Sequence, residues 1–76
     1  MNNVRRKSLQ SLVDQLEDIK SSLEDLQSEE EEYRDNMPEN MQGGERYEKA
    51  DAAVSNMEDA VSSLEEAISS IESATE

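Results

Sequence analysis

The residues best suited to do chemistry in this chain are paired carboxylates. Three pairs recur at intervals of seven residues, and their members are Glu17, Asp18, Glu24, Asp25, Glu31 and Glu32. Carboxylate pairs can exchange protons, bind a cation or present negative charge to a basic partner. Proton exchange requires a concave, partly desolvated site that separates the pKa values of two carboxyl groups, and the outer surface of a two-helix rod offers no such site.

Catalytic side chains of the other usual types are missing. Histidine and cysteine are absent, which removes imidazole bases, thiolate nucleophiles, disulfides and the common zinc ligands. The chain has no glycine-rich phosphate loop and no nucleophile–base pair, and the segment Asp35, Asn36, Glu39, Asn40 lacks the spacing and glycine of an EF-hand. The sequence therefore predicts a protein that is not an enzyme and has no cofactor and no specific metal site.

Charge and composition narrow the range of partners. The 76 residues include 20 acidic and seven basic ones, which gives a net charge of -13. DNA, RNA and anionic membranes would repel such a chain, so we expect no direct nucleic-acid partner and no membrane partner. No apolar run is long enough to predict a membrane-spanning helix, and the basic start Arg5–Lys7 lacks the apolar stretch of a signal peptide.

Apolar residues form two series with alternating steps of three and four. The first series is interrupted once, at Glu30, and consists of Leu9, Leu12, Leu16, Ile19, Leu23, Leu26, Tyr33 and Met37. The second is unbroken and consists of Tyr47, Ala50, Val54, Met57, Val61, Leu64, Ile68 and Ile71. This spacing is typical of helices with coiled-coil seams, and it outweighs the disorder that high charge and low hydrophobicity would indicate.

The residues between the two series are typical of a helix break. Pro38 cannot continue a helix, and Gly43 and Gly44 favour a turn. A short connection makes consecutive helices antiparallel neighbours, so the predicted fold is all-α, an antiparallel two-helix coiled-coil hairpin. The predicted bounds are about 4–36 for the first helix, about 37–44 for the loop and about 45–74 for the second helix, within a single domain of residues 1–76.

Charges predict the register of the hairpin. With Leu9 and Tyr47 at heptad position a, the apolar layers match, with Leu16 near Leu64 and Tyr33 near Tyr47. The e positions of the second helix are all acidic, whereas those of the first carry no acid and include most of its cations. Exposed ion pairs contribute little stability, but they specify orientation. The predicted pairs are Arg6 with Glu72, Lys20 with Glu58 or Glu65, and Arg34 with Asp51.

The second helix also carries a row of small residues beside its seam. Alanine occupies four successive g positions, which we call the alanine row: Ala53, Ala60, Ala67 and Ala74. Alanine is the best helix former, so this row could simply face solvent. A lone hairpin with no disulfide or metal has a thin core, however, and small scaffolds usually need further support. We therefore expect this face to pack against another helix, either of a second copy or of a target. The favoured expectation is a homo-oligomer, with a dimer forming a four-helix bundle as one solution.

The six paired carboxylates fall at outward b and c positions of the first helix, and we call them the acidic face. The pairs repeat about every 10.5 Å, and the whole rod carries roughly one net charge per 3.5 Å, close to the spacing of phosphates along one DNA strand. This density favours a nucleic-acid mimic that occupies a basic protein groove. Two alternatives remain: an ordinary solvated face, and a structural bundle whose targets have no relation to nucleic acid.

The loop region and parts of the second helix resemble known proteins, and the resemblance implies a cellular setting. Residues 33–48, which read YRDNMPENMQGGERYE, together with Ala53, Met57, Glu58, Ala60 and the segment Leu64–Ile68, resemble small acidic uncharacterised proteins of Gram-positive bacteria and their phages or mobile elements. The resemblance implies a cytoplasmic setting in a bacterial or phage-infected cell and transfers no activity and no site residue. Some small acidic proteins of that setting inhibit defence nucleases, and the analogy points to an anti-defence inhibitor.

Overall fold

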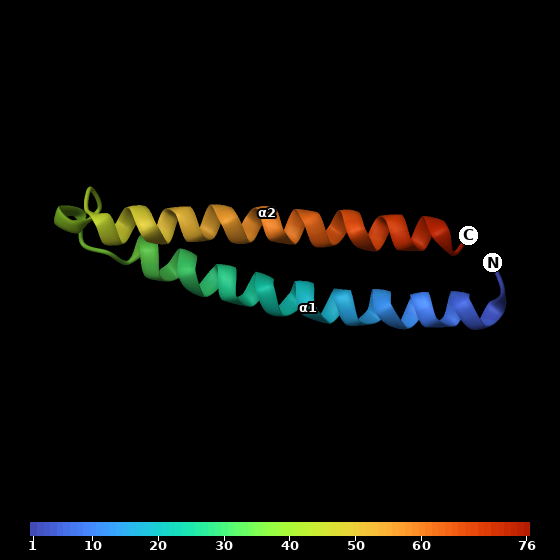
Figure 1. Ribbon diagram of the computed structural model, residues 1–76. Helices are drawn as coiled ribbons and strands as arrows, with labels where there is room; N and C mark the ends of the chain where they lie inside the picture. Colours follow the sequence, from blue (N-terminus) through green and yellow to red (C-terminus); the bar gives the residue numbers. More distant parts are fainter.

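The chain folds into a rod made of two long helices. The computed structural model describes residues 1–76, with α1 at Asn3–Asp35, a short 3-10 helix η1 at Glu39–Met41, and α2 at Glu45–Ala74. Figure 1 shows α1 and α2 side by side and antiparallel, with both termini at the end away from the loop, and the molecule measures 60 × 15 × 13 Å. The predicted all-α hairpin is confirmed, and each helix begins and ends within one residue of its predicted bounds.

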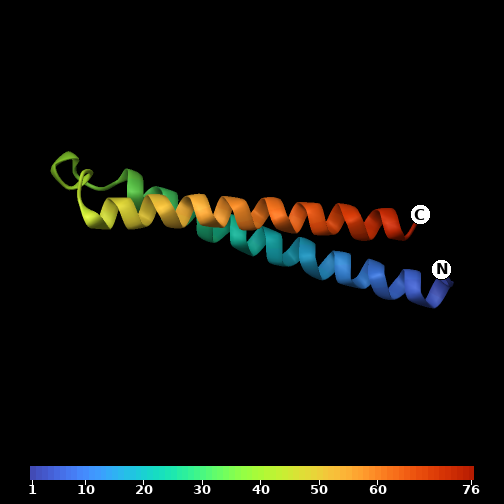
Figure 2. The same cartoon turned by 45° about the horizontal axis from the view of Figure 1, so that its top comes forward.

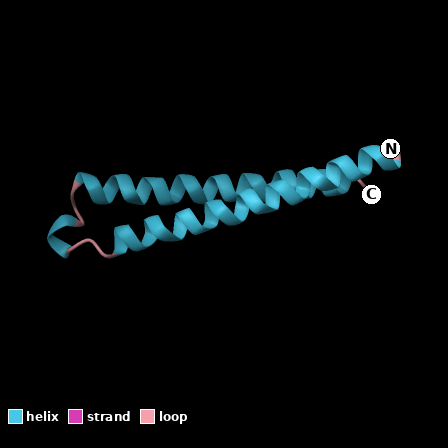
Figure 3. Ribbon diagram, turned by 90° about the horizontal axis from the view of Figure 1, so that it is seen from below, coloured by secondary structure: helices cyan, strands magenta, loops and turns pink.

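The two helices cross at a shallow angle. They lie one behind the other at the loop end in Figure 2 and at the terminal end in Figure 3, so each winds slightly about the other. Such a small crossing angle is expected when seams with a seven-residue repeat pack together. At the start of α1, the side chain of Asn2 caps the helix by accepting a hydrogen bond from the backbone N–H of Arg5 at 2.8 Å.

The loop turns without any left-handed residue. No residue has a positive φ angle, so neither glycine is required for its backbone conformation. Met37 is buried beneath the loop, and Pro38 precedes η1 and accepts a hydrogen bond from the N–H of Met41 at 2.8 Å. A Cβ atom at Gly44 would lie 3.2 Å from the carbonyl oxygen of Met41, whereas one at Gly43 would meet no atom within 4 Å. Close approach therefore selects glycine at position 44 only.

The core is thin and lies along the line between the helices. Six residues are buried, all of them apolar: Val13, Met37, Ala50, Val54, Val61 and Ile68. Every buried or half-buried residue of α2 up to Ile71, apart from Ala53 at position g, occupies an a or d position, as predicted. In α1, by contrast, the residues that face α2 occupy positions a and e.

This arrangement corrects the predicted packing of α1. The d positions of α1 were expected to lie in matched layers against α2, but Leu12, Ile19, Leu26 and Tyr33 are 48% to 55% exposed. In their place, Val13 at position e is only 4% exposed. The buried stripe of α1 is therefore turned by about 50° from the predicted one, given 3.6 residues per turn. We call the four exposed residues the apolar row.

Two ion pairs and the burial of Val13 accompany the choice of e over d. A contact between two helices buries only a narrow seam, and α1 offers apolar side chains at positions a, d and e. Turning e inward brings Lys20 Nζ to 3.6 Å from a carboxylate oxygen of Glu65 and Arg34 to 2.8 Å from Asp51, two of the predicted pairs. The predicted register is thus confirmed at these positions. Arg6 instead donates to Asn3 within α1.

Candidate functional site

The acidic face lies on the side of α1 away from α2. With a and e positions inward, the c positions point directly outward, and these are Asp18, Asp25 and Glu32. Glu17 and Glu24 are also exposed, whereas Glu31 is partly buried and accepts a weak hydrogen bond from Gln27 at 3.4 Å. A straight helix drifts by about 20° per seven residues against a heptad repeat, which turns position b toward α2 late in the helix.

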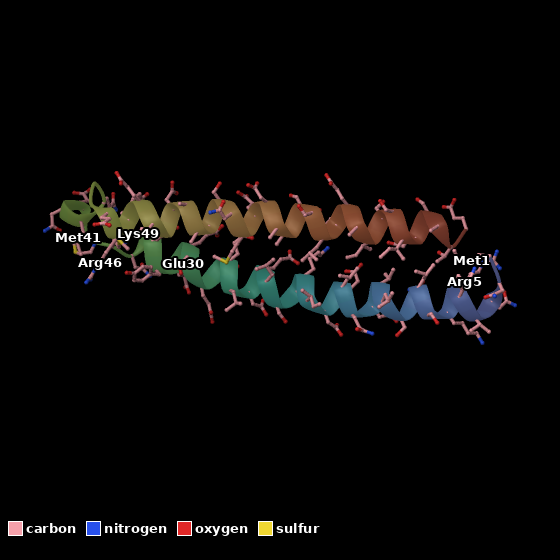
Figure 4. The ribbon with its side chains drawn as sticks, viewed as in Figure 1. Met1, Arg5, Glu30, Met41, Arg46 and Lys49 are labelled. Carbon is pink, nitrogen blue, oxygen red and sulfur yellow. The ribbon has the colours of Figure 1, made fainter.

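Most of the acidic face has no cation to neutralise it. Among its six members, only Glu17 lies within ion-pair distance of a basic side chain, at 3.9 Å from Lys20. The remaining ion pairs of the molecule place Lys20, Arg34 and Lys49 on carboxylates outside this face. Figure 4 shows side chains with red oxygen tips projecting outward along both helices. The negative charge of α1 is therefore left for solvent or for a partner.

Arg34 holds the loop ends of the two helices together. Its Nε lies 3.0 Å from Asp35 and its Nη1 lies 2.8 Å from Asp51 across the seam. The hydrogen bond that Arg34 donates to Asp35 raises the pKa of its guanidinium above the ordinary value, and the one it donates to Asp51 adds to this effect, whereas desolvation acts in the opposite direction. Because arginine is already protonated at any physiological pH, this pair fixes geometry and does not act as a pH switch.

A second candidate surface is apolar. The apolar row runs along α1 at intervals of seven residues, and part of it borders an open hollow of about 390 Å³ that is lined by Asp18, Ile19, Ser22, Leu23 and Leu26. A hollow of similar volume lies at the loop end, lined by Tyr33, Asn36, Met37, Pro38, Met41 and Arg46. Figure 4 places Met41 and Arg46 together at that end. Tyr33 thus connects the apolar row to the loop.

The alanine row borders the same surface. In an antiparallel pair, e positions flank one side of the seam and g positions flank the other. The ion pairs Lys20–Glu65 and Arg34–Asp51 join e positions and mark the first side. The d positions of α1 and the g positions of α2 therefore share the opposite side. Of the alanine row, Ala53 is half-buried, whereas Ala60, Ala67 and Ala74 are exposed.

Five of the six carboxylates of the acidic face, and three of the four alanines of the alanine row, are exposed at the surface. The apolar row, by contrast, is a surface that the heptad spacing did not predict. That spacing assigned Leu12, Ile19, Leu26 and Tyr33 to the hairpin core. Two signals could have found them: Val13 gives α1 a third apolar position in its heptad, and the basic e positions must turn toward the acidic e positions of α2. If the a and e positions of α1 face α2, the contact between two helices is too narrow to bury the d positions as well.

Other kinds of site have no counterpart in the geometry. No three acidic side chains converge where they could hold a metal ion. Neither helix has a stretch both long and apolar enough to cross a membrane. Comparison with protein-family models, curated proteins and solved structures finds no match to this chain. The resemblance of the loop region to small acidic bacterial and phage proteins therefore stays a prediction.

Proposed function

We propose that the hairpin is a non-enzymatic protein-interaction module whose acidic face occupies the basic groove of a nucleic-acid-binding protein, such as a defence nuclease. The setting that accompanies this proposal is the cytoplasm of a bacterial or phage-infected cell. The observation that carries it is the uncompensated charge of α1: five of the six carboxylates of the acidic face have no ion-pair partner within the molecule.

The arrangement of these carboxylates suits a groove that binds a phosphate backbone. Asp18, Asp25 and Glu32 are held at regular intervals of about 10.5 Å on one side of a straight helix. The helix holds these positions before binding, so a partner would not have to order a flexible acidic chain. Lysine and arginine side chains that line a phosphate-binding groove would form ion pairs with this row and release their bound counterions, as they do when they bind phosphates.

The experiment compares two variants with the same change in net charge. D18N/D25N/E32Q removes three charges from the outward line of α1, and E48Q/D59N/E66Q removes three from exposed positions of α2, all without ion pairs. The native chain and both variants serve as bait in a nuclease-treated bacterial lysate. We expect a protein that the native chain and the α2 variant capture, that the α1 variant loses, and that short duplex DNA or about 0.5 M salt displaces.

The outcome also decides between this function and the alternative. If both variants capture the same proteins equally, the acidic face is a solvated surface and the mimic proposal is wrong. The second candidate, a structural bundle with no nucleic-acid-related target, is favoured by one observation, the half-exposed apolar row of α1. That candidate predicts self-association that is insensitive to all six of these substitutions.

A further inference from the structure

We infer that two copies of the hairpin pair through the apolar row of α1 and the alanine row of α2, with their loops at opposite ends of a four-helix bundle. The inference does not rest on the proposed function. The c positions of the acidic face point away from α2; Asp18 borders the hollow beside Ile19, whereas Asp25 and Glu32 line neither hollow and stay exposed in such a pair.

The width of the apolar stripe on α1 points to a bundle. A helix in a two-stranded seam needs apolar residues at two heptad positions, whereas a helix in a bundle buries a third, at e or g. From Leu9 onward α1 has apolar side chains at a and d, except for Glu30, and at e through Val13, and the hairpin turns its a and e positions toward α2. The d positions complete a bundle-type face when a second copy covers them.

The size of this face fits a stable dimer. The apolar row spans about 32 Å at 1.5 Å per residue, and it lies on a side of a rod that measures 60 by 15 Å. That whole side offers about 900 Å², and a standard interface buries about 800 Å² on each partner, so a dimer of standard size also covers the polar residues beside the row. The face is also continuous with the seam between α1 and α2, since Ala53 and the a positions of α1 are half-buried at its floor. A second copy would extend an apolar core that already exists.

Charge favours a second copy as the occupant. A chain with a net charge of -13 repels its own copies over most of its surface. The positions that border this face carry few carboxylates. Glu29 is the single acid at the g positions of α1 and the c positions of α2, and Asp18 lines the hollow beside Ile19; the g and c residues are Ser8, Gln15, Ser22 and Glu29 on α1, and Lys49, Asn56, Ser63 and Ser70 on α2. A basic protein would find little to bind here, whereas a second copy meets little repulsion.

The ends of the rod set the orientation. At the terminal end, residues 1–13 contain Arg5, Arg6 and Lys7 and no acid, and residues 67–76 of the neighbouring helix contain two acids, Glu72 and Glu76, and no cation. Residues 24–51, at the loop end, contain eleven acids and three cations, so the loop end is far more negative. Arg5 lies seven residues before Leu12, so it occupies the same heptad position and places a positive charge beyond the terminal end of the apolar row. With loops at opposite ends, the basic start of each copy lies beside the acidic loop end of the other. With loops at the same end, like charges would lie together.

Sedimentation of the native chain and two variants tests the face. We expect the native chain to sediment as a dimer, I19Q/L26Q to weaken dimerisation by at least roughly 100-fold, and the control S21Q/S28Q, at exposed outward positions of α1, to dimerise as the native chain does. Glutamine keeps the charge unchanged and is a good helix former. A native monomer at millimolar concentration, or equal dimerisation of all three chains, would overturn the inference.

A distance measurement on the otherwise native chain tests the orientation and does not depend on how the variants fold. The chain has no cysteine, so G43C carries a single spin label at a loop position with open space around its Cβ. Loops at opposite ends place the two labels about 60 Å apart, the length of the rod. Labels within about 30 Å of each other, as packed neighbouring helices with loops at one end require, would contradict the proposed dimer.

Discussion

The two helices carry similar heptad patterns and use them differently. α2 turns both of its apolar rows toward its neighbour, whereas α1 buries one row with the stems of its e residues and leaves the other half-exposed. The helices differ in where their cations lie, since α1 has basic residues at e and α2 has acids there. The difference shows that two helices with the same apolar spacing need not bury the same rows: α1 turns Val13 and its ion-paired e residues inward and leaves its d residues half-exposed.

The largest expected difference between the helices comes from the same substitution, isoleucine to alanine, made once in each helix. Ile68 on α2 is 5% exposed and Ile19 on α1 is 54% exposed. We expect Ile68→Ala to lower the free energy of unfolding by about 2 kcal/mol, because it removes buried carbon and leaves a cavity. Ile19→Ala should cost less than about 1 kcal/mol in dilute solution. Urea unfolding followed by circular dichroism measures both.

The same two substitutions can be compared at low and high protein concentration. If a second copy covers the apolar row, the cost of Ile19→Ala rises with protein concentration because the dimer is stabilised by mass action. Equal costs for the two isoleucines in dilute solution would mean that α1 is not turned as described.

A second prediction compares two adjacent residues of α1. Val13 is buried, whereas the larger side chain of Leu12 is about half exposed. We expect Val13→Ala to destabilise the hairpin by about 1 kcal/mol and Leu12→Ala to destabilise it by roughly half as much in dilute solution, although the leucine substitution removes more carbon. Thermal unfolding of both variants checks this order. The opposite order would support the matched layers predicted from the sequence.

A smaller effect is expected from the ion pair that helps to set the orientation of α1. Arg34→Gln removes the link to Asp51 and Asp35, and we expect the unfolding midpoint to fall by roughly 2 °C. The difference from the native chain should shrink in about 0.5 M salt, because salt screens exposed charges. A difference that is unchanged by salt would show that the guanidinium acts through packing and not through charge.

The last comparison is between the two loop glycines, and Gly43 should show the smallest effect of all. Gly44 precedes α2 as its N-cap and has the Met41 carbonyl oxygen 3.2 Å from where a Cβ would lie. We expect Gly44→Ala to cost about 0.5 to 1 kcal/mol, whereas Gly43→Ala should change stability by less than about 0.5 kcal/mol because its Cβ meets open space. Urea midpoints distinguish the two, and equal values would contradict the close approach at Gly44.

The helices and their register could be predicted from the sequence because local signals agree. Pro38 ends one apolar series, the glycines precede the next, and cations at e in one helix match acids at e in the other. The rotation of α1 could not be predicted in the same way. Heptad spacing shows that Leu12 and Leu16 share a stripe, but it does not show how many rows the neighbouring helix can cover. The number of rows that α2 can cover depends on three-dimensional packing, and this number determines that the d positions of α1 stay half-exposed.

The ion pair between Arg34 and Asp51 has a consequence for how the molecule folds. It joins residues 17 positions apart, whereas the pair between Lys20 and Glu65 closes a much longer stretch of chain. Because the entropy lost on closing a loop grows with its length, we expect contacts beside the loop to form before contacts near the termini. A hairpin that closes in this order with e inward still has its apolar row half-exposed when α1 and α2 are fully paired.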